Sequence, residues 1–546
     1  MRRVMLVLLL SAAALLLTHS AFVRWTTIPA PSDEGPPLNS ELHVEERGQG
    51  VELSTEGGRS WRDGSLIHLE LEGSPRQIGH GHGVLVGHLF NRFGVGTVDS
   101  ATSARENGWR RMLSGKATAW QQRNLTDSLA PRHLAELALF SKFAAGDGES
   151  QSAFSENLSW HARLSGYTPL QDGQRVRSQS IAVWGKSSVD GHLLVGRSFT
   201  IDHTDALSQQ KTIFVYRPQG KEAFITVGWP GLAGAFWGVN AQRIFISSHA
   251  VRTDDSNSVG TPRVFLVRKL LEEAKSLADV IAGAKVLERR MPGVLLVVDG
   301  KTGEAAVLEF TGKRLFVRKP KSKYLVTTNH LLHGKFSKDG RNDQVRRHSS
   351  SGLRYQRLMQ LAKRFSGRID VSTLALMLRN RTALDDEPLA LGHHAAIDAL
   401  DALDGTVLDL TDFVLWVARG PHLLGGFEPF DLRYLLQGAN TMRGDLKEIP
   451  AEPLLDSLPW RAIDRARQAM AYARRRAASG APEEAYRFAK RALLFAEEYP
   501  PAYLLAGDLA WELDRKVEAA SHYRRFLATN PSDQDQRLRA NARSER

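Results

Sequence analysis

The 546-residue chain contains no cysteine. This absence excludes disulfides, thiolate metal ligands, a lipid-modified cysteine and a cysteine nucleophile. The sequence also lacks the G-x-S-x-G, P-loop and H-E-x-x-H motifs, which argues against an α/β-hydrolase, a nucleotidase and a zinc peptidase. If the protein is an enzyme, its nucleophile has to be another residue type.

A concentrated basic segment is also missing. The net charge is +12 and the isoelectric point about 9.8, but lysine and arginine are spread along the chain. A nucleic-acid-binding domain usually gathers such charge on one face, and no aromatic-basic motif is present. We expect a solvated basic surface and no nucleic-acid partner, with contact to an anionic membrane surface as the functional alternative.

Long apolar runs are absent except at the N-terminus. After MRR, the stretch VMLVLLLSAAALLL extends with THSAFV to Val23, a length of 20 residues. Two arginines before a short apolar run are typical of a secretory signal, and this length just spans a bilayer. Residues 1–24 are therefore predicted to be a signal peptide or, preferentially, an uncleaved membrane anchor. Because the positive end stays inside, the body is expected to be exported to the periplasm or another extracytoplasmic compartment, anchored by this single transmembrane helix.

Composition divides the rest of the chain into segments. Residues 25–60 are rich in proline, glycine and glutamate, and residues 441–459 interrupt the pattern again, so both are predicted to be linkers. Apolar runs from 178 to about 330, helical spacing after 350 and late strands before 440 follow one another in blocks. Such blocks indicate a layered α+β fold rather than strict βαβ alternation.

The C-terminal segment, residues 460–535, is rich in alanine and has helical spacing. Residues at the spacing of a roughly 34-residue tetratricopeptide repeat are Tyr503, Ala506, Gly507, Ala510, Ala519, Tyr523 and Pro531, with Ala473 and Ala485 one repeat earlier. Small residues at these positions let two helices approach closely. Because so few repeats rarely fold alone, we expect the segment to pack against the main domain or against a protein partner.

The stretch SQSIAVWGKSSVDGHLLVGRSFTID, residues 178–202, is typical of a β-hairpin with a Val-Asp-Gly turn. Ser178 stands at the head of the first strand and Arg197 inside the second. Some hydrolases cut the chain before such a residue and use its freed α-amine as the base. That amine has a pKa of about 7.7–8.0, so it can take the hydroxyl proton at working pH.

This hairpin resembles the signature of the peptidase C45 family, the acyl-coenzyme A:6-aminopenicillanate acyltransferase-like N-terminal nucleophile hydrolases. In that family a Cys-Thr/Ser-Ser opening precedes an Asp-Gly turn and a Gly-Arg-Asn-Phe/Leu-Asp ending. Further similar segments follow in the family's order over about residues 62–435: GSPRQIGHGHGVLVG, VGWPGLAGAFWGVNAQRI, LVTTNHL, GLRYQRL and HHAAIDALDALDGTVLDLTDFVLWVARGP with GGFEPFDL. Each motif is weak alone, and their shared order and spacing make the resemblance specific.

The resemblance implies a four-layer αββα sandwich at residues 178–440, followed by the small all-α C-terminal domain. It also implies cleavage between Arg177 and Ser178, which makes residues 61–177 a pro-region or small subunit. The implied reaction is hydrolysis or acyl transfer on a linear amide or acyl group of a small molecule, with no metal or organic cofactor. The implied site residues are Ser178 as nucleophile, Asn240 and Asn329 as oxyanion donors, and Arg197 and Arg354 as ligands of the substrate's polar end.

The sequence departs from the family pattern at three positions. Ser178 stands where the family has cysteine, Arg177 where it has glycine, and Thr200 where it has a carboxylate that orients the amine. Asp202 lies on the same strand face one pleat further along and is the alternative orienting group. Ser180 is the alternative nucleophile. These departures leave open a catalytically degenerate pseudoenzyme that acts as a binding or scaffold protein through its repeats.

Two histidine pairs are given structural interpretations. His80 and His82 lack neighbouring carboxylates or thiols, so glycine-flanked loop histidines are preferred over a metal site. His393 and His394 precede an expected strand, where a packing role is preferred.

Overall fold

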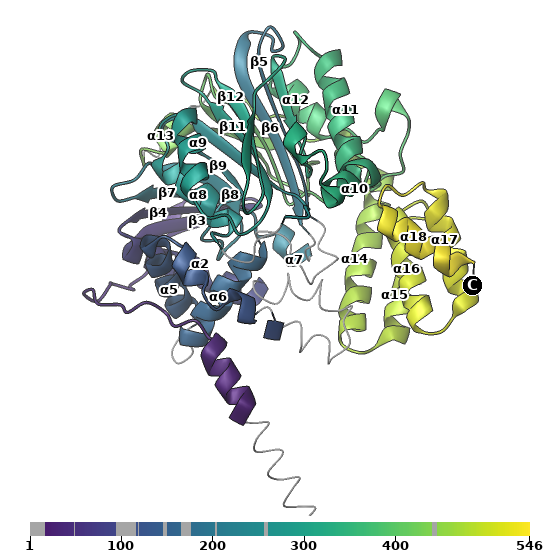
Figure 1. Ribbon diagram of the computed structural model, residues 1–546, viewed down its shortest axis with the longest axis horizontal. Helices are drawn as coiled ribbons and strands as arrows, with labels where there is room; N and C mark the ends of the chain where they lie inside the picture. The colour runs from purple at the N-terminus through teal and green to yellow at the C-terminus, as the bar shows by residue number, and fades with distance from the viewer. Residues whose placement is uncertain are drawn as a thin grey trace, which may run out of the picture.

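The computed structural model describes residues 17–48, 50–93, 116–117, 119–145, 150–164, 176–201, 205–255, 260–438 and 445–545. Within these residues, the strands form two facing sheets with helices outside them, and the C-terminal helices form a separate lobe (Figure 1). The predicted combination of helices and strands is confirmed.

The larger sheet, sheet A, contains eleven strands in the described part of the chain. Their spatial order is β1 (His43–Arg47), β2 (Gly50–Thr55), β3 (Gly58–Asp63), β4 (Leu66–Gly73), β7 (Thr212–Pro218), β8 (Phe224–Gly228), β9 (Trp237–Asn240), β10 (Ile244–Ala250), β11 (Gly293–Asp299), β12 (Ala305–Phe310) and β13 (Leu315–Arg318). The strands β4 and β7 pair in parallel, which joins the segment before Ser178 to the one after it in one sheet.

The linker predicted at residues 25–60 is corrected by this sheet. It contains β1, β2 and the start of β3, paired in antiparallel register. The side chains of β1 are almost all exposed, since the strand is an edge of sheet A. An exposed, charged edge strand has the composition of a linker, so composition alone does not reveal it.

The smaller sheet, sheet B, contains the predicted hairpin. Among the described residues its strand order is β14 (Tyr324–Thr327), β5 (Val176–Gly185), β6 (Gly191–Ile201), β15 (Asp404–Asp409), β16 (Val414–Ala418) and β17 (Phe427–Asp431). The strands β5 and β6 pair in antiparallel register, with Ser178 opposite Phe199. Ser178, the nucleophile predicted from the sequence, is the third residue of β5, an inner strand of sheet B.

Three apolar layers hold the two sheets and their helices together. Ala182 and Leu408 of sheet B and Phe245 of sheet A belong to the layer between the sheets. The outer face of sheet A is covered by α2 (Pro75–Phe93), α8 (Arg263–Glu273) and α9 (Leu277–Val286). The outer face of sheet B is covered by α11 (Ser350–Arg364) and α12 (Val371–Leu378). The further helices of this part are α5 (Pro131–Ala145), α6 (Ser150–Leu164), α7 (Asp205–Ser208), α10 (Gly340–His348) and α13 (Leu432–Leu435).

The expectation that His80 and His82 lie in a loop is wrong, because both are buried in α2. Two of the glycines beside them, Gly79 and Gly83, face α5, and Gly81 faces the backbone of Gly57 in the β2–β3 turn, so none of them marks a turn of its own. A Cβ added to Gly79 would lie 2.2 Å from the Glu136 carbonyl oxygen, and one on Gly83 would lie 2.7 Å from Phe143 Cβ. Glycine at this spacing permits close helix packing, which outweighs its low helix propensity.

The C-terminal lobe consists of α14 (Leu458–Ala478), α15 (Pro482–Phe495), α16 (Pro500–Glu512), α17 (Lys516–Ala528) and α18 (Gln534–Ser544). A Cβ on Gly507 would lie 2.9 Å from the Tyr523 ring, so the small residue lets α16 and α17 approach closely. Trp460 of α14 packs in one apolar cluster with Leu400 and Leu424 of the sandwich. The lobe is therefore attached to the main domain through its first helix.

Most of the predicted membrane anchor lies outside the described residues, which begin at residue 17. No helix in the described part of the chain has both the length and the apolar character needed to cross a membrane.

Candidate active site

Ser178 is fully buried near the start of β5. Its backbone N–H donates to Asn329 Oδ1 at 3.0 Å, and its carbonyl oxygen accepts from Arg354 Nη1 at 3.0 Å. The main chain on both sides of this serine is thus held by two of the predicted site residues. The structure brings these three residues together although Ser178 and Asn329 are 151 positions apart.

Asn329 follows β14, which pairs with β5 through Thr327 and Ser180. Its Oδ1 accepts from the Ser178 N–H and from Arg354 Nη2, the latter at 2.9 Å. Both of these groups are donors, which fixes the orientation of the amide. Its Nδ2 then donates to Ser178 Oγ at 3.2 Å and to the Ala250 carbonyl at 2.9 Å. This N–H group therefore lies close to the place where an oxyanion would form if Ser178 Oγ attacked a carbonyl carbon.

His249, which no sequence motif indicates, also contacts Ser178. It belongs to β10 of sheet A, and its Nδ1 lies 2.8 Å from Ser178 Oγ. Its Nε2 lies 2.9 Å from Thr327 Oγ1. Burial, followed by the nearby arginines 197, 263 and 354, holds the pKa of His249 well below 6.5, so the imidazole is neutral. The alternation in IFISSHA places Ser247 and His249 on one strand face, but nothing in the sequence shows that this face meets β5.

Ser180 and Arg197 form a second polar chain beside the first. Ser180 Oγ lies 2.9 Å from Ser247 Oγ, which accepts from Arg197 Nε at 2.9 Å. Arg197 also pairs with the carboxylate of Asp404, and burial lowers the pKa of Arg197 to about 10. Its Nη2 is buried and has no hydrogen-bond partner among the residues that the structure describes. Ser180 therefore points to a hydroxyl and an arginine network, whereas Ser178 points to an imidazole.

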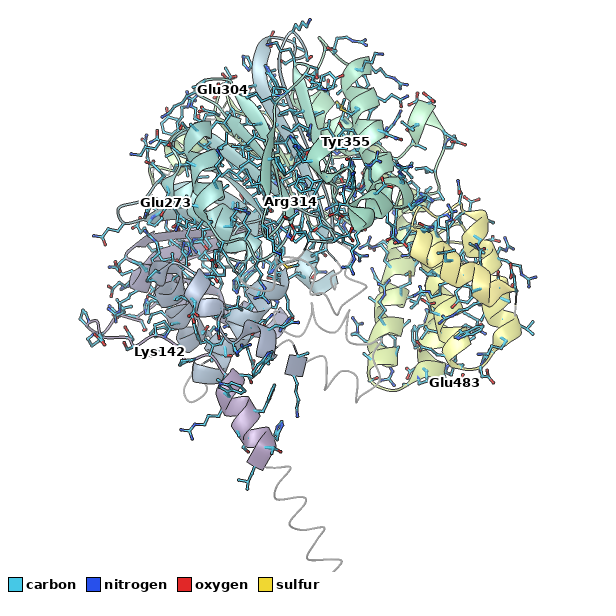
Figure 2. The ribbon with its side chains drawn as sticks, in the orientation of Figure 1. Lys142, Glu273, Glu304, Arg314, Tyr355 and Glu483 are labelled. Carbon is cyan, nitrogen blue, oxygen red and sulfur yellow. The ribbon has the colours of Figure 1, made fainter. Side chains whose placement is uncertain are left out.

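Arg354 lies on α11, beside Tyr355, whose side chain is labelled in Figure 2. Its hydrogen-bond acceptors among the described residues are all neutral: Ser178 O, Gln179 Oε1 and Asn329 Oδ1. Burial, with a further contribution from Arg177, lowers the pKa of Arg354 to about 9. A buried cation with neutral partners places uncompensated positive charge next to Ser178.

Thr200 lies opposite Arg177 in the β5–β6 pair. Its hydroxyl donates to Asp401 Oδ1 at 3.3 Å, and the same carboxylate forms an ion pair with Arg177. A carboxylate therefore does stand at this place, supplied by a loop rather than by β6. Asp202 lies outside the described residues.

Asn240 is not part of this cluster, which corrects its assignment as an oxyanion donor. Its Nδ2 donates to the carbonyl oxygens of Leu271 at 2.9 Å and Ala274 at 2.7 Å, and its Oδ1 accepts from the N–H groups of Gln242 and Ile244. It ends β9 and accepts from the N–H of Ile244, the first residue of β10, whereas His249 stands near the other end of β10, roughly 17 Å further along that extended strand. Asn240 fixes the β9–β10 turn to α8.

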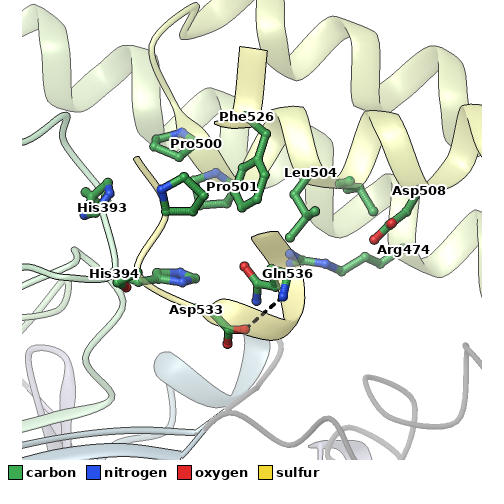
Figure 3. Close-up of a pocket in the computed structure, with 14 residues that line it drawn as sticks. His393, His394, Arg474, Pro500, Pro501, Leu504, Asp508, Phe526, Asp533 and Gln536 are labelled. Atoms are coloured by element: carbon green, nitrogen blue, oxygen red, sulfur yellow. Dashed lines mark hydrogen bonds between the residues drawn. The ribbon is translucent and has the colours of Figure 1, made fainter. Parts of the chain in front are cut away.

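Two cavities lie between the sandwich and the C-terminal lobe. The smaller, about 50 Å³, is lined by His394 of the sandwich and by Arg474, Asp508 and Gln536 of the lobe (Figure 3). The wider, about 740 Å³, is lined by residues of α11 and of α16–α17. His393 fixes this boundary, with its Nε2 3.1 Å from the Thr529 carbonyl oxygen, in keeping with a packing role.

A group that could hold a metal ion consists of His192, Asp409 and Asp412. The carboxylate of Asp409 is already engaged, with Oδ2 2.7 Å from His192 Nδ1 and Oδ1 accepting from the Thr411 and Asp412 N–H groups. We assign no metal to these residues.

Comparison with known proteins agrees with the resemblance at the level of the reaction class. A family model described as acyl-coenzyme A:6-aminopenicillanic acid acyl-transferase matches residues 195–387. The match contains His249, Asn329 and Arg354 but begins after Ser178. The chain is thus similar to this acyl-transferase family over residues 195–387, and the matched region does not include Ser178.

The individual proteins and solved structures that are similar to this chain share little sequence identity with it. An uncharacterized protein from Archaeoglobus fulgidus is 25% identical over 268 residues, which are 46% of this chain and 44% of that protein, so this chain spans less than half of that relative. A solved structure titled N-acylethanolamine-hydrolyzing acid amidase ortholog from Caenorhabditis elegans shares 14% identity, with a TM-score of 0.31 over 43% of this chain and 93% of that one. Two variants of conjugated bile acid hydrolase from Clostridium perfringens share 12% identity, with TM-scores of 0.34 and 0.35 over 46% and 50% of this chain and 92% and 98% of theirs.

Proposed function

We propose that the protein is an amide hydrolase or acyltransferase of the N-terminal nucleophile type, with Ser178 as the nucleophile after cleavage of the Arg177–Ser178 bond. The observation that supports this most is the set of contacts around one buried serine. Its hydroxyl lies 2.8 Å from an imidazole and 3.2 Å from an amide N–H, and its main chain is held by a buried arginine. A serine with only a packing role needs no such set of buried polar partners, which are costly to desolvate.

In the proposed reaction, the free α-amine of Ser178 takes the hydroxyl proton while Oγ attacks the substrate's carbonyl carbon. The carbonyl oxygen becomes negative and is stabilised by Asn329 Nδ2, which already lies 3.2 Å from Oγ. The ammonium then returns the proton to the leaving amine, and an acyl-serine ester remains. Water or an acceptor amine attacks this ester, and Ser178 is regenerated.

The arginines are proposed to bind and orient negative or polar groups. Arg354 holds the Ser178 carbonyl and Asn329 Oδ1, so its charge adds to the stabilisation of the oxyanion. Arg197 has one buried, unpartnered Nη2 that is available to a polar group of the substrate. Asn240 has no part in this mechanism.

We propose that Asp401 takes the orienting role for which the sequence offers Thr200 or Asp202. Asp401 is held by the Thr200 hydroxyl and paired with Arg177. Once the chain is cut, Arg177 becomes the new C-terminus of the preceding segment, and its side chain is free to leave. The carboxylate is then free to pair with the new ammonium group of Ser178.

Export, an N-terminal membrane tether and a protein partner at the tetratricopeptide-like lobe remain part of this proposal. The N-terminal sequence MRRVMLVLLLSAAALLL supports the first two. The small residues packed between α16 and α17 support the repeat assignment.

The experiment that tests the proposed function compares the intact masses of purified wild type, Ser178→Ala and Ser180→Ala. We expect two fragments that meet at Arg177–Ser178 in the wild type and in Ser180→Ala, and one uncut chain in Ser178→Ala. Hydrolysis of a panel of N-acyl amides should then follow the cut form. An uncut wild-type chain would contradict the self-cleaving mechanism and favour a non-catalytic binding protein.

A further inference from the structure

The proposed mechanism leaves one step without a base. Before the chain is cut, the Ser178 nitrogen is part of a peptide bond, and its N–H is donated to Asn329 Oδ1 at 3.0 Å. An amide nitrogen cannot accept the hydroxyl proton, so the α-amine that serves the mature site is not available for the step that creates it. The uncut chain therefore needs another proton acceptor at Ser178 Oγ.

The hydrogen bonds at Ser178 Oγ identify that acceptor. Asn329 Nδ2 donates to Oγ, which leaves the serine's own proton for the second contact, His249 Nδ1 at 2.8 Å. The imidazole then carries its proton on Nε2 and donates it to Thr327 Oγ1 at 2.9 Å. The Thr327 hydroxyl has the Ser180 carbonyl oxygen as its acceptor at 3.4 Å. In this arrangement every proton has a partner, and the imidazole presents a lone pair to the serine hydroxyl.

Building on the proposed function, we propose that His249 is the catalytic base and then the acid of self-cleavage, and that Thr327 is its positioning residue. His249 Nδ1 takes the proton of Ser178 as Oγ bonds to the Arg177 carbonyl carbon. The bond between that carbon and the Ser178 nitrogen then breaks, and the imidazolium gives its proton to the departing nitrogen. The product is an ester between Arg177 and Ser178 Oγ, which water hydrolyses to the Arg177 carboxylate and a serine with a free α-amine.

The other side chains around Ser178 cannot do this. Asn329 only donates to Oγ through Nδ2, and Arg354 donates to the Ser178 carbonyl. Ser180 is held by the Ser247 hydroxyl. His249 belongs to sheet A and Ser178 belongs to sheet B, so the two residues meet only when the two sheets pack together. Cleavage is therefore expected only after the sandwich has folded.

The test follows cleavage of the full chain made in a cell-free reaction, by intact mass against time. We expect His249→Ala and His249→Asn to cleave at least about 100-fold more slowly than the wild type, as for a lost general base. Asparagine still offers a hydrogen bond to Ser178 but cannot take its proton, so it separates proton transfer from packing. Thermal unfolding of His249→Asn should stay close to that of Ser178→Ala, which excludes misfolding as the cause.

Two substitutions of Thr327 test whether its hydroxyl group positions His249. Thr327→Val removes the hydroxyl that binds His249 Nε2 and should slow cleavage by about 10-fold, as expected for one lost hydrogen bond. Thr327→Ser keeps the hydroxyl and should cleave like the wild type. Hydroxylamine, which splits esters, should release the fragments faster from the wild type and Thr327→Ser. It should not accelerate the slow release expected from His249→Asn, in which formation of the ester limits the rate.

The outcomes separate this inference from the proposed function. A wild type that cleaves while His249→Asn cleaves at the same rate would overturn the role of His249 and leave the nucleophile in place. A wild type that never cleaves would overturn both. Equal rates for Thr327→Val and Thr327→Ser would overturn the role of Thr327.

Discussion

Two buried arginines of this protein have opposite surroundings. Arg268 of α8 donates to Glu136 of α5 at 2.6 and 2.5 Å and to Glu272 at 2.9 Å. Burial lowers the pKa of Arg268, but the two carboxylates raise it by more than burial lowers it, so the net shift is upward. Arg354 is equally buried but donates to neutral oxygens, and its pKa falls to about 9.

The different surroundings of Arg268 and Arg354 indicate different roles for the two clusters. With Arg132, whose Nε lies 3.5 Å from Glu272 Oε2, the Arg268 cluster has two arginines and two carboxylates and is balanced in charge. It joins α5, which precedes the proposed cleavage site, to α8, which follows it. It is expected to keep the two fragments together after cleavage. The Arg354 cluster is unbalanced and lies at Ser178, the proposed nucleophile, so its positive charge is placed to stabilise negative charge that a reaction there would develop.

The largest expected effect comes from breaking the balanced cluster. Arg268→Met should lower the free energy of unfolding by roughly 3–5 kcal/mol, because it leaves Glu136 buried without its partner. Urea denaturation measures this change. The double variant Glu136→Leu with Arg268→Met should be more stable than Arg268→Met alone, and a less stable double variant would contradict the pairing.

Breaking the unbalanced cluster should affect the reaction instead. Arg354→Met is expected to slow self-cleavage and amide hydrolysis by about 100-fold, the effect of losing one oxyanion-stabilising group. Its free energy of unfolding should fall much less than that of Arg268→Met, since no carboxylate loses its partner. Mass spectrometry measures the cleavage of Arg354→Met and Arg268→Met, and urea denaturation measures their free energies of unfolding. Equal destabilisation of the two variants would contradict the proposed difference between the two arginine clusters.

Asn240 and Asn329 test the same distinction between a residue needed for stability and a residue needed for the reaction. Asn240 binds the Leu271 and Ala274 carbonyls, at the end of the helix that carries Arg268. Asn240→Ala should therefore cost about 2 kcal/mol of stability and leave the cleavage rate of the folded protein unchanged. Asn329→Ala should instead slow cleavage. A cleavage defect in Asn240→Ala at a temperature where it is fully folded would restore Asn240 to the site.

The smallest expected effect is a pH dependence next to Arg268. His161 Nδ1 lies 2.7 Å from the Asn157 carbonyl, its Nε2 accepts from the Ala233 N–H at 2.9 Å, and burial lowers its pKa from 6.5 to about 4. Between these two pH values His161 binds a proton in the unfolded chain but not in the folded chain, so the free energy of unfolding decreases as the pH falls from 6.5 towards 4. Between pH 7 and 5.5 this group should account for about 1 kcal/mol.

The measurement is the free energy of unfolding of the wild type and of His161→Asn at both pH values. The wild type should lose about 1 kcal/mol more than the variant over this interval. Parallel curves for the two proteins would show that His161 does not titrate differently in the folded and unfolded chain.

The sequence predicted the parts of the site that depend on local order. The hairpin with Ser178 at its head follows from two apolar runs and a turn, and the structure has β5 and β6 there. Asn329 and Arg354 were identified by resemblance, and both contact Ser178. Asn240 was identified in the same way, but the same residue type also suits a turn, and that is where the structure has it.

What was missed depends on contacts between distant segments. His249 lies 71 positions from Ser178 and on the opposite sheet, so no local pattern connects the two residues. Asp401 comes from a loop that follows an apolar segment, and only the fold brings it to Thr200. The glycines of α2 were assigned to a loop because their role in helix packing depends on α5.

By itself, the sequence determined the absence of any thiol chemistry, the alternation of the hairpin strands and the small residues between the C-terminal helices. These properties follow from residue identity and from periods of two or about 3.6 residues, which are local. The tertiary structure alone decided which imidazole meets Ser178, which carboxylate stands beside Thr200 and which buried arginine has its charge balanced. Those outcomes depend on how two sheets pack face to face, and the apolar residues between the sheets set that packing without specifying which polar side chains meet within it.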